Sequence, residues 1–258
     1  QDNRMAWVDA SIDFDADLLP QPILAVSSEF QQHCSSLHQH QKGQLLYITE
    51  GYVEVYLAAS RDYCLLTPQF MVWIPAQMLH QIQVKQRIQY HSVWFDPSVY
   101  TLAMHSKIFM PSELLRAVLQ RMMLLPLDTN WQQGSALHLG QLCLDEINTI
   151  QAAALSLQWP EHQKLRTLLE TYALPPSRTE LADALHVSEK TLTRIFKKDT
   201  QMSYQQWRQN YKLILAIKLL AEKKRISEIA DYLEFSSDSA FIYFFKRLTG
   251  KSPTQYFD

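Results

Sequence analysis

The chain has 258 residues, of which 47% are hydrophobic and 19% are charged, and its formal net charge is −2. This composition is typical of a globular protein of one or two domains. The sequence has no run of eighteen apolar residues, so no membrane span is predicted. It also lacks the features of a signal peptide, and we expect a cytoplasmic protein. The charge is divided unevenly: residues 160–258 carry +4 and residues 1–159 carry −6, so an acidic N-terminal part precedes a basic C-terminal part.

Residues 20–97 contain short runs of alternating or β-branched residues separated by turn signals such as Glu50-Gly51 and Thr67-Pro68. Strands at this length and spacing predict a small barrel or a double-sheet roll, which can hold one ligand in its interior. The predicted strands are Ile23–Phe30, Gln44–Thr49, Tyr52–Ala58, Met71–Ile74, His80–Val84 and Ile88–Phe95.

Within this region lies the pattern His38-x-His40-x3-Gln44-x6-Gly51, followed by Pro75-x4-His80. It resembles the two cupin motifs, in which two histidines, a glutamate and a third histidine bind a metal ion. The resemblance implies a candidate site for Zn, Ni or Fe at His38, His40, Gln44 and His80, although glutamine replaces the carboxylate and is a weaker ligand. Gln77 occupies a turn position that is usually glycine in the motif. Alternatively, these residues make polar contacts to an organic effector or have no ligand.

The three cysteines, Cys34, Cys64 and Cys143, have no metal-binding pair spacing, and we expect reduced thiols. Aromatic residues on the predicted strands are candidate walls of an effector pocket. Each is equally well interpreted as an ordinary core residue. The candidates are Tyr47, Trp73, Tyr90 and Trp94.

Two amphipathic helices are predicted after the strands, over residues 111–125 and 135–152. Apolar residues at helical spacing indicate core packing, and an exposed self-complementary patch on such helices would support a two-fold dimer. Pro160 marks the predicted boundary with the last domain.

The C-terminal region contains an internal duplication. Glu180-Leu-Ala-Asp-Ala-Leu-His-Val-Ser188 returns as Glu228-Ile-Ala-Asp-Tyr-Leu-Glu-Phe-Ser236, and the residues that follow repeat with an offset of 49. Each copy reads as a helix-turn-helix, in which a serine caps the second helix and two apolar residues at i, i+4 spacing face the core. The second helix of such a unit fits the major groove of DNA.

These segments resemble the DNA-binding domain of the AraC/XylS family of bacterial transcription regulators. The resemblance covers about residues 162–258 and includes Ser188-x3-Leu192-x-Arg194-x-Phe196-Lys197, Ala216-x2-Leu219-Leu220 and Thr249-Gly250-x-Ser252-Pro253. It implies an α+β protein with a cupin-like effector-binding domain (1–105), a helical dimerisation segment and linker (106–159), and a DNA-binding domain of two helix-turn-helix units joined by a long helix (160–258). Double-stranded promoter DNA, a small-molecule effector, RNA polymerase and a second copy of the chain are the implied partners, in the bacterial nucleoid.

Three turn positions that are usually glycine in the family are His186, Gln201 and Glu234, and a residue there held at positive φ costs of order 1 kcal/mol. Tyr243 replaces an arginine that the family often carries on the second recognition helix. The predicted base contacts are Lys190, Thr193, Arg194, Ser239 and Tyr243. The predicted phosphate contacts are Lys197, Lys198, Arg208, Lys212, Ser237, Lys246 and Lys251.

The leading hypothesis is therefore a non-enzymatic, effector-controlled transcription regulator that acts as an activator. A transition-metal-sensing regulator that uses the cupin histidines is the first alternative. The second, a cupin metalloenzyme with a DNA-binding appendage, is disfavoured by Gln44 at the carboxylate position and by the lack of another acid/base pair near the motif.

Overall fold

The computed structural model describes residues 7–8, 14–58, 62–151 and 156–256 and divides into two compact units. The first unit comprises Gln1–Ser60 and Cys64–Ser156, and the second comprises Arg61–Tyr63 and Leu157–Asp258. The expected boundary at residues 105/106 does not separate compact units, because the helices that follow it belong to the first unit. Residues 152–155 of the expected linker lie outside the described residues. Within the described ranges, no helix combines the length and apolar character needed to cross a membrane.

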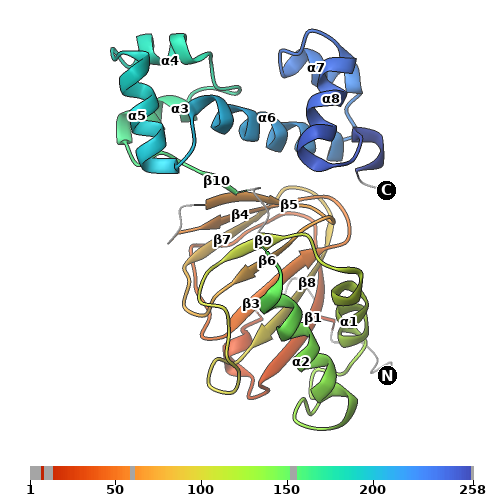
Figure 1. Ribbon diagram of the computed structural model, residues 1–258. Coiled ribbons are helices and arrows are strands. Elements are labelled where there is room, and N and C mark those ends of the chain that lie inside the picture. Colours follow the sequence, from red (N-terminus) through yellow and green to blue (C-terminus); the bar gives the residue numbers. More distant parts are fainter. Residues whose placement is uncertain (1–6, 9–13, 59–61, 152–155, 257–258) are drawn as a thin grey trace. The chain divides into compact units, whose positions relative to one another are not determined.

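The described strands form two five-stranded antiparallel sheets packed as a sandwich (Figure 1). The sandwich belongs to the first unit except for its residues 62–63 and 157–158, which are assigned to the second. The first sheet has the order β1 (Ile23–Phe30), β8 (Ile88–Phe95), β3 (Gly43–Ile48), β6 (Met71–Ile74) and β9 (Lys107–Phe109). The second has the order β10 (Ser156–Gln158), β5 (Asp62–Leu66), β4 (Val53–Leu57), β7 (His80–Val84) and β2 (His33–Cys34). A short 3₁₀ helix, η1 (Ala16–Leu18), precedes β1. The double-sheet form of the predicted β domain is thereby confirmed.

Helices α1 (Glu113–Met123) and α2 (Gly134–Thr149) cover the outer face of the first sheet (Figure 1). The Ser112 hydroxyl accepts a hydrogen bond from the Leu115 amide and so begins α1 as an N-cap. Buried residues of both helices form one apolar cluster with alternate residues of the sheet. Both faces of β3 are consequently buried, which explains why the strand reads as a nearly continuous apolar run.

The second unit is helical. Its elements are α3 (Gln163–Glu170), α4 (Arg178–Ala184), α5 (Glu189–Thr200), α6 (Tyr204–Ala221), α7 (Ile226–Tyr232), α8 (Asp238–Thr249) and the 3₁₀ helix η2 (Pro253–Gln255). Serine hydroxyls cap the starts of four of these helices, at Ser177, Ser188, Ser203 and Ser237. Two helix-turn-helix units, α4–α5 and α7–α8, are joined by α6 (Figure 1). The predicted helical architecture is confirmed.

The turn positions that were expected to require a left-handed backbone do adopt one. His186, Gln201 and Glu234 have φ values of 56°, 57° and 59°, and Gln77 in the β domain has φ of 61°. The peptide groups on the C-terminal sides of α4 and α7 are satisfied in the same way, because Val187 donates to the Ala182 carbonyl and Phe235 donates to the Ala230 carbonyl. The duplication in sequence is therefore also a duplication of turn geometry.

Candidate functional site

The first candidate recognition helix is α5. Leu192 and Phe196 are fully buried on its inner face, which fixes the opposite face toward solvent. That outer face carries Lys190, Thr193, Arg194 and Lys197, which helical spacing places within one turn of one another. Three of the four are exposed; Thr193 is half-buried. The four predicted contacts on this helix therefore share one surface.

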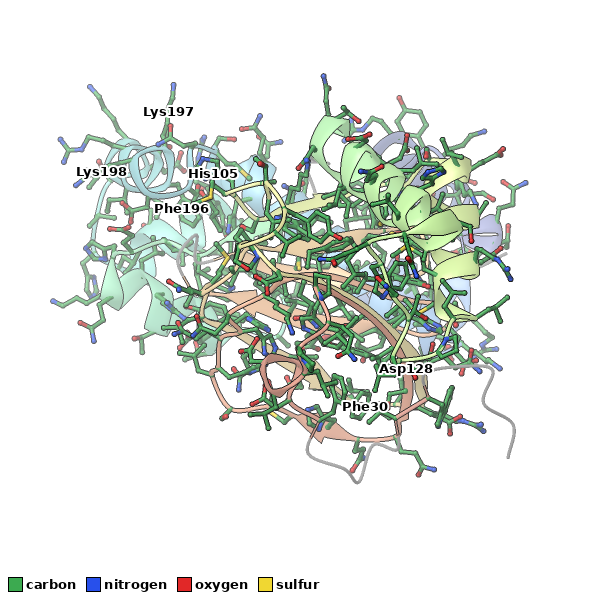
Figure 2. The ribbon with its side chains drawn as sticks, turned by 90° about the horizontal axis from the view of Figure 1, so that it is seen from below. Phe30, His105, Asp128, Phe196, Lys197 and Lys198 are labelled. Atoms are coloured by element: carbon green, nitrogen blue, oxygen red, sulfur yellow. The ribbon has the colours of Figure 1, made fainter. Side chains whose placement is uncertain are left out.

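The cationic side chains of this surface are Lys190, Arg194 and Lys197. Among the residues that the structure describes, none of the three side chains makes an ion pair or a hydrogen bond. The two acidic residues on the helix have other partners: Glu189 is held by Arg178 and by the Thr179 hydroxyl, both at 2.6 Å, and Asp199 accepts from the amides of residues 161 and 162. Lys197 and Lys198 extend outward from α5 (Figure 2). Free cations on a protruding helix suit phosphate and guanine recognition.

The second candidate recognition helix, α8, has the same register. Ser239, Tyr243 and Lys246 occupy the positions of Lys190, Arg194 and Lys197, and all three are exposed. Tyr243 is 70% exposed, so it is not part of the core. The hydroxyl of Ser237 caps the helix by accepting from the Ala240 amide at 3.2 Å. This surface has one cation where the α5 surface has three.

Two predicted phosphate contacts, Lys212 and Arg208, have hydrogen-bond partners within the protein. Lys212 is only 8% exposed, and its ammonium group donates to the carbonyl of Leu233 at the end of α7. The Arg208 guanidinium donates to the Pro175 carbonyl at 2.6 Å and to Glu234 at 2.8 Å. The Lys212 prediction was wrong because α6 is buried on several sides, and this long cationic side chain reaches a carbonyl group of a neighbouring turn before it reaches solvent. Arg208 is half-buried, and its contact with phosphate stays a prediction.

Helix α6 sets the spacing of the two units. Its 18 residues span roughly 27 Å at 1.5 Å per residue. Trp207 anchors its first half, since the ring is fully buried, stacks on Tyr211 at 5.4 Å and donates to the Gln158 carbonyl at 2.7 Å. A rigid connection of this kind holds two recognition helices on one body.

The first unit contains a cavity of about 680 Å³ between its sheets. Apolar walls come from both sheets and from the segment before β1. Polar groups come mainly from the segment between β2 and β3. The lining residues include Phe14, Val26, Phe30, Ile82, Val84, Tyr90 and Trp94, with Asp15, Asp17, Ser28, His33, Cys34, His38, His40 and Gln44. This size and mixture suit a small organic ligand.

Two cavity-lining residues keep a buried polar atom without a partner among the described residues: the amide oxygen of Gln44 and the indole nitrogen of Trp94. The amide nitrogen of Gln44 donates to Ser92 at 2.8 Å and to Tyr90 at 3.1 Å, so the side chain is fixed in orientation. Burial raises the pKa of Tyr90, which keeps this phenol neutral. The wall thus offers one acceptor and one donor.

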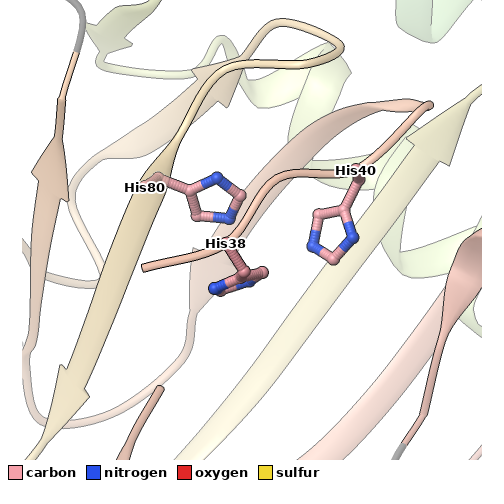
Figure 3. Close-up of side chains that lie close together, drawn as sticks. All are labelled: His38, His40 and His80. Atoms are coloured by element: carbon pink, nitrogen blue, oxygen red, sulfur yellow. The ribbon is translucent and has the colours of Figure 1, made fainter. Parts of the chain in front are cut away.

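Three histidines gather beside this wall (Figure 3). A ring nitrogen of each of His38, His40 and His80 lies within 4.8 Å of the others, and the ring centroids of His38 and His80 are 4.3 Å apart. An antiparallel bridge between residues 38 and 80 holds the two segments together. Burial lowers the pKa of His80 to about 4 and also lowers the pKa of His40. All three predicted histidines therefore meet.

Tyr47 and Trp73 do not line the cavity, so their assignment as effector walls was wrong. They lie on the outer face of the first sheet, in the cluster that packs on α1 and α2. Successive residues of a strand point to opposite faces, so Gln44 on β3 and Tyr90 and Trp94 on β8 face inward while Tyr47 and Trp73 face the helices. Tyr47 stacks on His91 at 4.8 Å, and the His91 imidazole bonds to the Ser27 hydroxyl at 2.8 Å.

Several cavity residues were not identified from the sequence. Ile82 and Val84 follow His80 at every second position on β7, so period-two spacing from that histidine would have found them. Phe14, Asp15 and Asp17 come from the segment before β1, and no local pattern connects them with the strands.

The fold and these two sites define a DNA-binding protein with a separate ligand-binding domain. A family model described as an AraC-like ligand binding domain matches residues 21–137, and one described as a helix-turn-helix domain matches residues 181–258. The chain belongs to the AraC family of transcriptional regulators, with an N-terminal ligand-binding domain and a C-terminal helix-turn-helix DNA-binding domain.

Curated relatives are similar in the same regions. The HTH-type transcriptional regulator NimR of Escherichia coli is 29% identical over 228 residues, which span 86% of this chain and 82% of NimR. RipA of Corynebacterium diphtheriae is 32% identical over 101 residues, 38% of this chain and 30% of RipA. Among solved structures, ToxT from Vibrio cholerae with a bound unsaturated fatty acid aligns over 91% of this chain and 94% of ToxT, with 12% identity and a TM-score of 0.37. Both curated relatives are named as HTH-type transcriptional regulators.

Proposed function

We propose that a small organic effector binds in the cavity of the N-terminal domain and thereby controls promoter binding by the C-terminal domain, so that the protein acts as an activator. The observation that carries this proposal is the pair of unpartnered buried groups on cavity-lining residues, the Gln44 amide oxygen and the Trp94 indole nitrogen. A buried donor or acceptor without a partner costs about 1–3 kcal/mol. An effector that carries both a donor and an acceptor on an apolar body would recover that free energy.

DNA recognition is assigned mainly to the first helix-turn-helix. Arg194 is the proposed guanine-reading residue, supported by Lys190 and Thr193, with Ser239 and Tyr243 as weaker contacts in the second unit. The exposed positions Lys197, Lys198, Ser237, Lys246 and Lys251 are proposed to bind phosphate. The uncommitted cations on α5 support this order, because a bidentate arginine–guanine pair discriminates by about 1–3 kcal/mol.

We propose that the protein forms a homodimer through exposed leucines of the helical segment after the β domain. Leu114 and Leu124 on and after α1 are 49% and 51% exposed, whereas the other large apolar side chains of the helix are buried, which supports a two-fold contact with a second copy. RNA polymerase is the proposed partner on DNA, and the cytoplasm, at the nucleoid, is the proposed location. We further propose that the protein has no catalytic activity. The dimer proposal is tested with Leu114→Glu, which places a charge in the proposed two-fold contact. The sedimentation coefficient of this variant should be that of a monomer, whereas the wild-type protein should sediment as a dimer.

The DNA proposal is tested by selecting binding sites from a random duplex library with the full-length protein. Arg194→Ala should lose roughly 5- to 150-fold in affinity for the selected site and relax the preference at one base pair. Arg121→Ala, at an exposed arginine near the end of α1, is the matched control and should leave the selected sequence unchanged. Full sequence discrimination by Arg194→Ala would remove that residue from the proposal.

The effector proposal is tested by a melting-temperature screen of small organic molecules. A true effector should raise the melting temperature of the wild-type protein, lose this effect in Gln44→Met, and change the affinity for the selected DNA. A library in which every stabilising compound acts equally on Gln44→Met would contradict the assignment of this cavity.

A further inference from the structure

The cluster of His38, His40 and His80 has a feature that organic-effector binding does not use. The imidazole Nδ1 of His38 lies 2.9 Å from the Ser36 carbonyl, and Nδ1 of His80 lies 2.9 Å from the Met78 carbonyl. A carbonyl oxygen only accepts hydrogen bonds, so both Nδ1 atoms carry the proton and both Nε2 atoms keep a lone pair. A backbone acceptor on one ring nitrogen is the arrangement that orients metal-binding histidines.

The free nitrogen of His80 is the strongest single observation. His80 is 1% exposed, and its Nε2 is buried without a partner among the described residues. A lone pair held in this way is costly unless something donates to it. Because two further imidazoles lie within reach, a cation that accepts all three lone pairs would compensate this cost at once.

Acidic residues beside His40 add a favourable field for a cation. Asp15, Asp17 and His40 also have ligand atoms within 4.8 Å of one another. The segment that carries the two aspartates is anchored, since the Asp17 carboxylate accepts from the Gln41 amide at 2.7 Å and the buried Lys42 ammonium donates to the Ala16 and Leu19 carbonyls at 2.7 and 2.6 Å. The negative charge is therefore held next to the histidines.

The distances require a small contraction. Ligand nitrogens at 2.0–2.1 Å from a tetrahedral ion lie about 3.4 Å apart, whereas the three ring nitrogens here lie within 4.8 Å. Each pair of nitrogens must therefore approach by up to about 1.4 Å. His38 and His40 are only half-buried, so rotation of these two side chains can supply it while His80 stays in place.

We propose that His38, His40 and His80 form a divalent transition-metal site of the Zn²⁺ type, with three imidazole ligands and a fourth coordination position open to the cavity. The site departs from a three-histidine, one-carboxylate set because position 44 is a glutamine, whose amide oxygen is neutral and a weaker ligand than a carboxylate. Its charge balance comes from Asp15 and Asp17 instead. The open position would take an anionic or chelating group of the effector. That last statement rests on the proposed function, whereas metal binding itself does not.

The test uses full-length protein without a histidine tag, stripped with a chelator that is then removed. Zn²⁺ is titrated calorimetrically and Co²⁺ by its visible spectrum, which is intense only for a tetrahedral or five-coordinate ion. We expect one equivalent of metal per chain and a tetrahedral Co²⁺ spectrum. His40→Ala and His80→Ala should each weaken binding at least 10- to 100-fold, and His138→Ala, an exposed histidine on α2, should not.

His40→Ala keeps the test decisive if His80→Ala does not fold, because His40 is half-buried. Absence of stoichiometric binding, an octahedral Co²⁺ spectrum, or binding that survives in His40→Ala would overturn the inference. DNA binding is measured on the same stripped protein. Retained DNA selectivity with no metal binding would overturn this inference alone, and loss of DNA selectivity in every preparation would count against the proposed function separately.

Discussion

Lys212 and Lys197 provide a paired test of whether a lysine supports the fold or binds DNA. Lys212 is buried on α6 and donates to the Leu233 carbonyl, whereas Lys197 is exposed on α5. Methionine at either position keeps most of the apolar stem and removes the ammonium group. The two variants should therefore fail in opposite assays.

The loss of unfolding free energy expected for Lys212→Met follows from three contacts of the ammonium group. It donates to the Leu233 carbonyl, lies 3.8 Å from Glu234 and lies 5.1 Å from the Phe235 ring centroid. A hydrogen bond to a charged group contributes about 1.5–3 kcal/mol, and the exposed Glu234 adds little. Loss of about 2 kcal/mol corresponds to a fall of roughly 8–16 °C in the melting temperature of a unit of this size.

The assays are calorimetric melting of the full chain and the salt dependence of binding to a non-specific duplex. Lys212→Met should lower the melting temperature of the C-terminal unit and leave the salt slope unchanged. Lys197→Met should leave the unfolding free energy within about 0.5 kcal/mol of wild type and lower the salt slope by about one. A Lys212→Met protein of unchanged stability whose salt slope falls by one would refute the reasoning, since it would make Lys212 a phosphate contact.

Three further predictions concern other parts of the fold. Burial lowers the pKa of His91 to about 4, so between pH 6.5 and 4 the unfolded chain binds a proton that the folded chain excludes. The unfolding free energy should therefore fall by about 1–2 kcal/mol as the pH falls through this window. His91→Gln should reduce that loss, measured by denaturant titrations at several pH values. Gln201→Gly, at φ of 57°, should raise the unfolding free energy of the C-terminal unit by about 1 kcal/mol, and an unchanged or lower value would show that the left-handed turn is unstrained. Gly43→Ala places a Cβ 2.6 Å from the Trp73 ring, so it should destabilise the N-terminal unit by about 1–3 kcal/mol, measured by urea unfolding; wild-type stability would mean that Trp73 shifts freely.

The local structure of the C-terminal unit could be predicted from the sequence. The long helix expected to join the two units is α6 (Tyr204–Ala221), and the recognition helix expected after the capping Ser188 is α5 (Glu189–Thr200). Serine caps, apolar spacing and turn positions act within a few residues of one another, so short segments contain the information. The strands over Ile23–Phe30 and Ile88–Phe95 were predicted for the same reason.

The short strands β2, β5 and β9 were not predicted, because strands of two to five residues are stabilised mainly by their neighbours in the sheet and not by local pattern. The burial of Lys212 and the hydrogen bond from Arg208 to the Pro175 carbonyl were also missed. A lysine or arginine on a helix reads as a surface charge until the carbonyl groups of distant turns are in place around it.

The sequence by itself determined the two helix-turn-helix units, the cap and left-handed turn positions, and the three histidines of the β domain. Only the tertiary structure decided which aromatic residues face the cavity, because β3 is buried on both sides and alternation cannot distinguish the helix-packed face of Tyr47 from the inner face of Gln44. It also decided that Asp15 and Asp17 lie beside His40, across more than twenty residues of chain. Contacts of that kind depend on how the whole unit packs, and no local pattern encodes them.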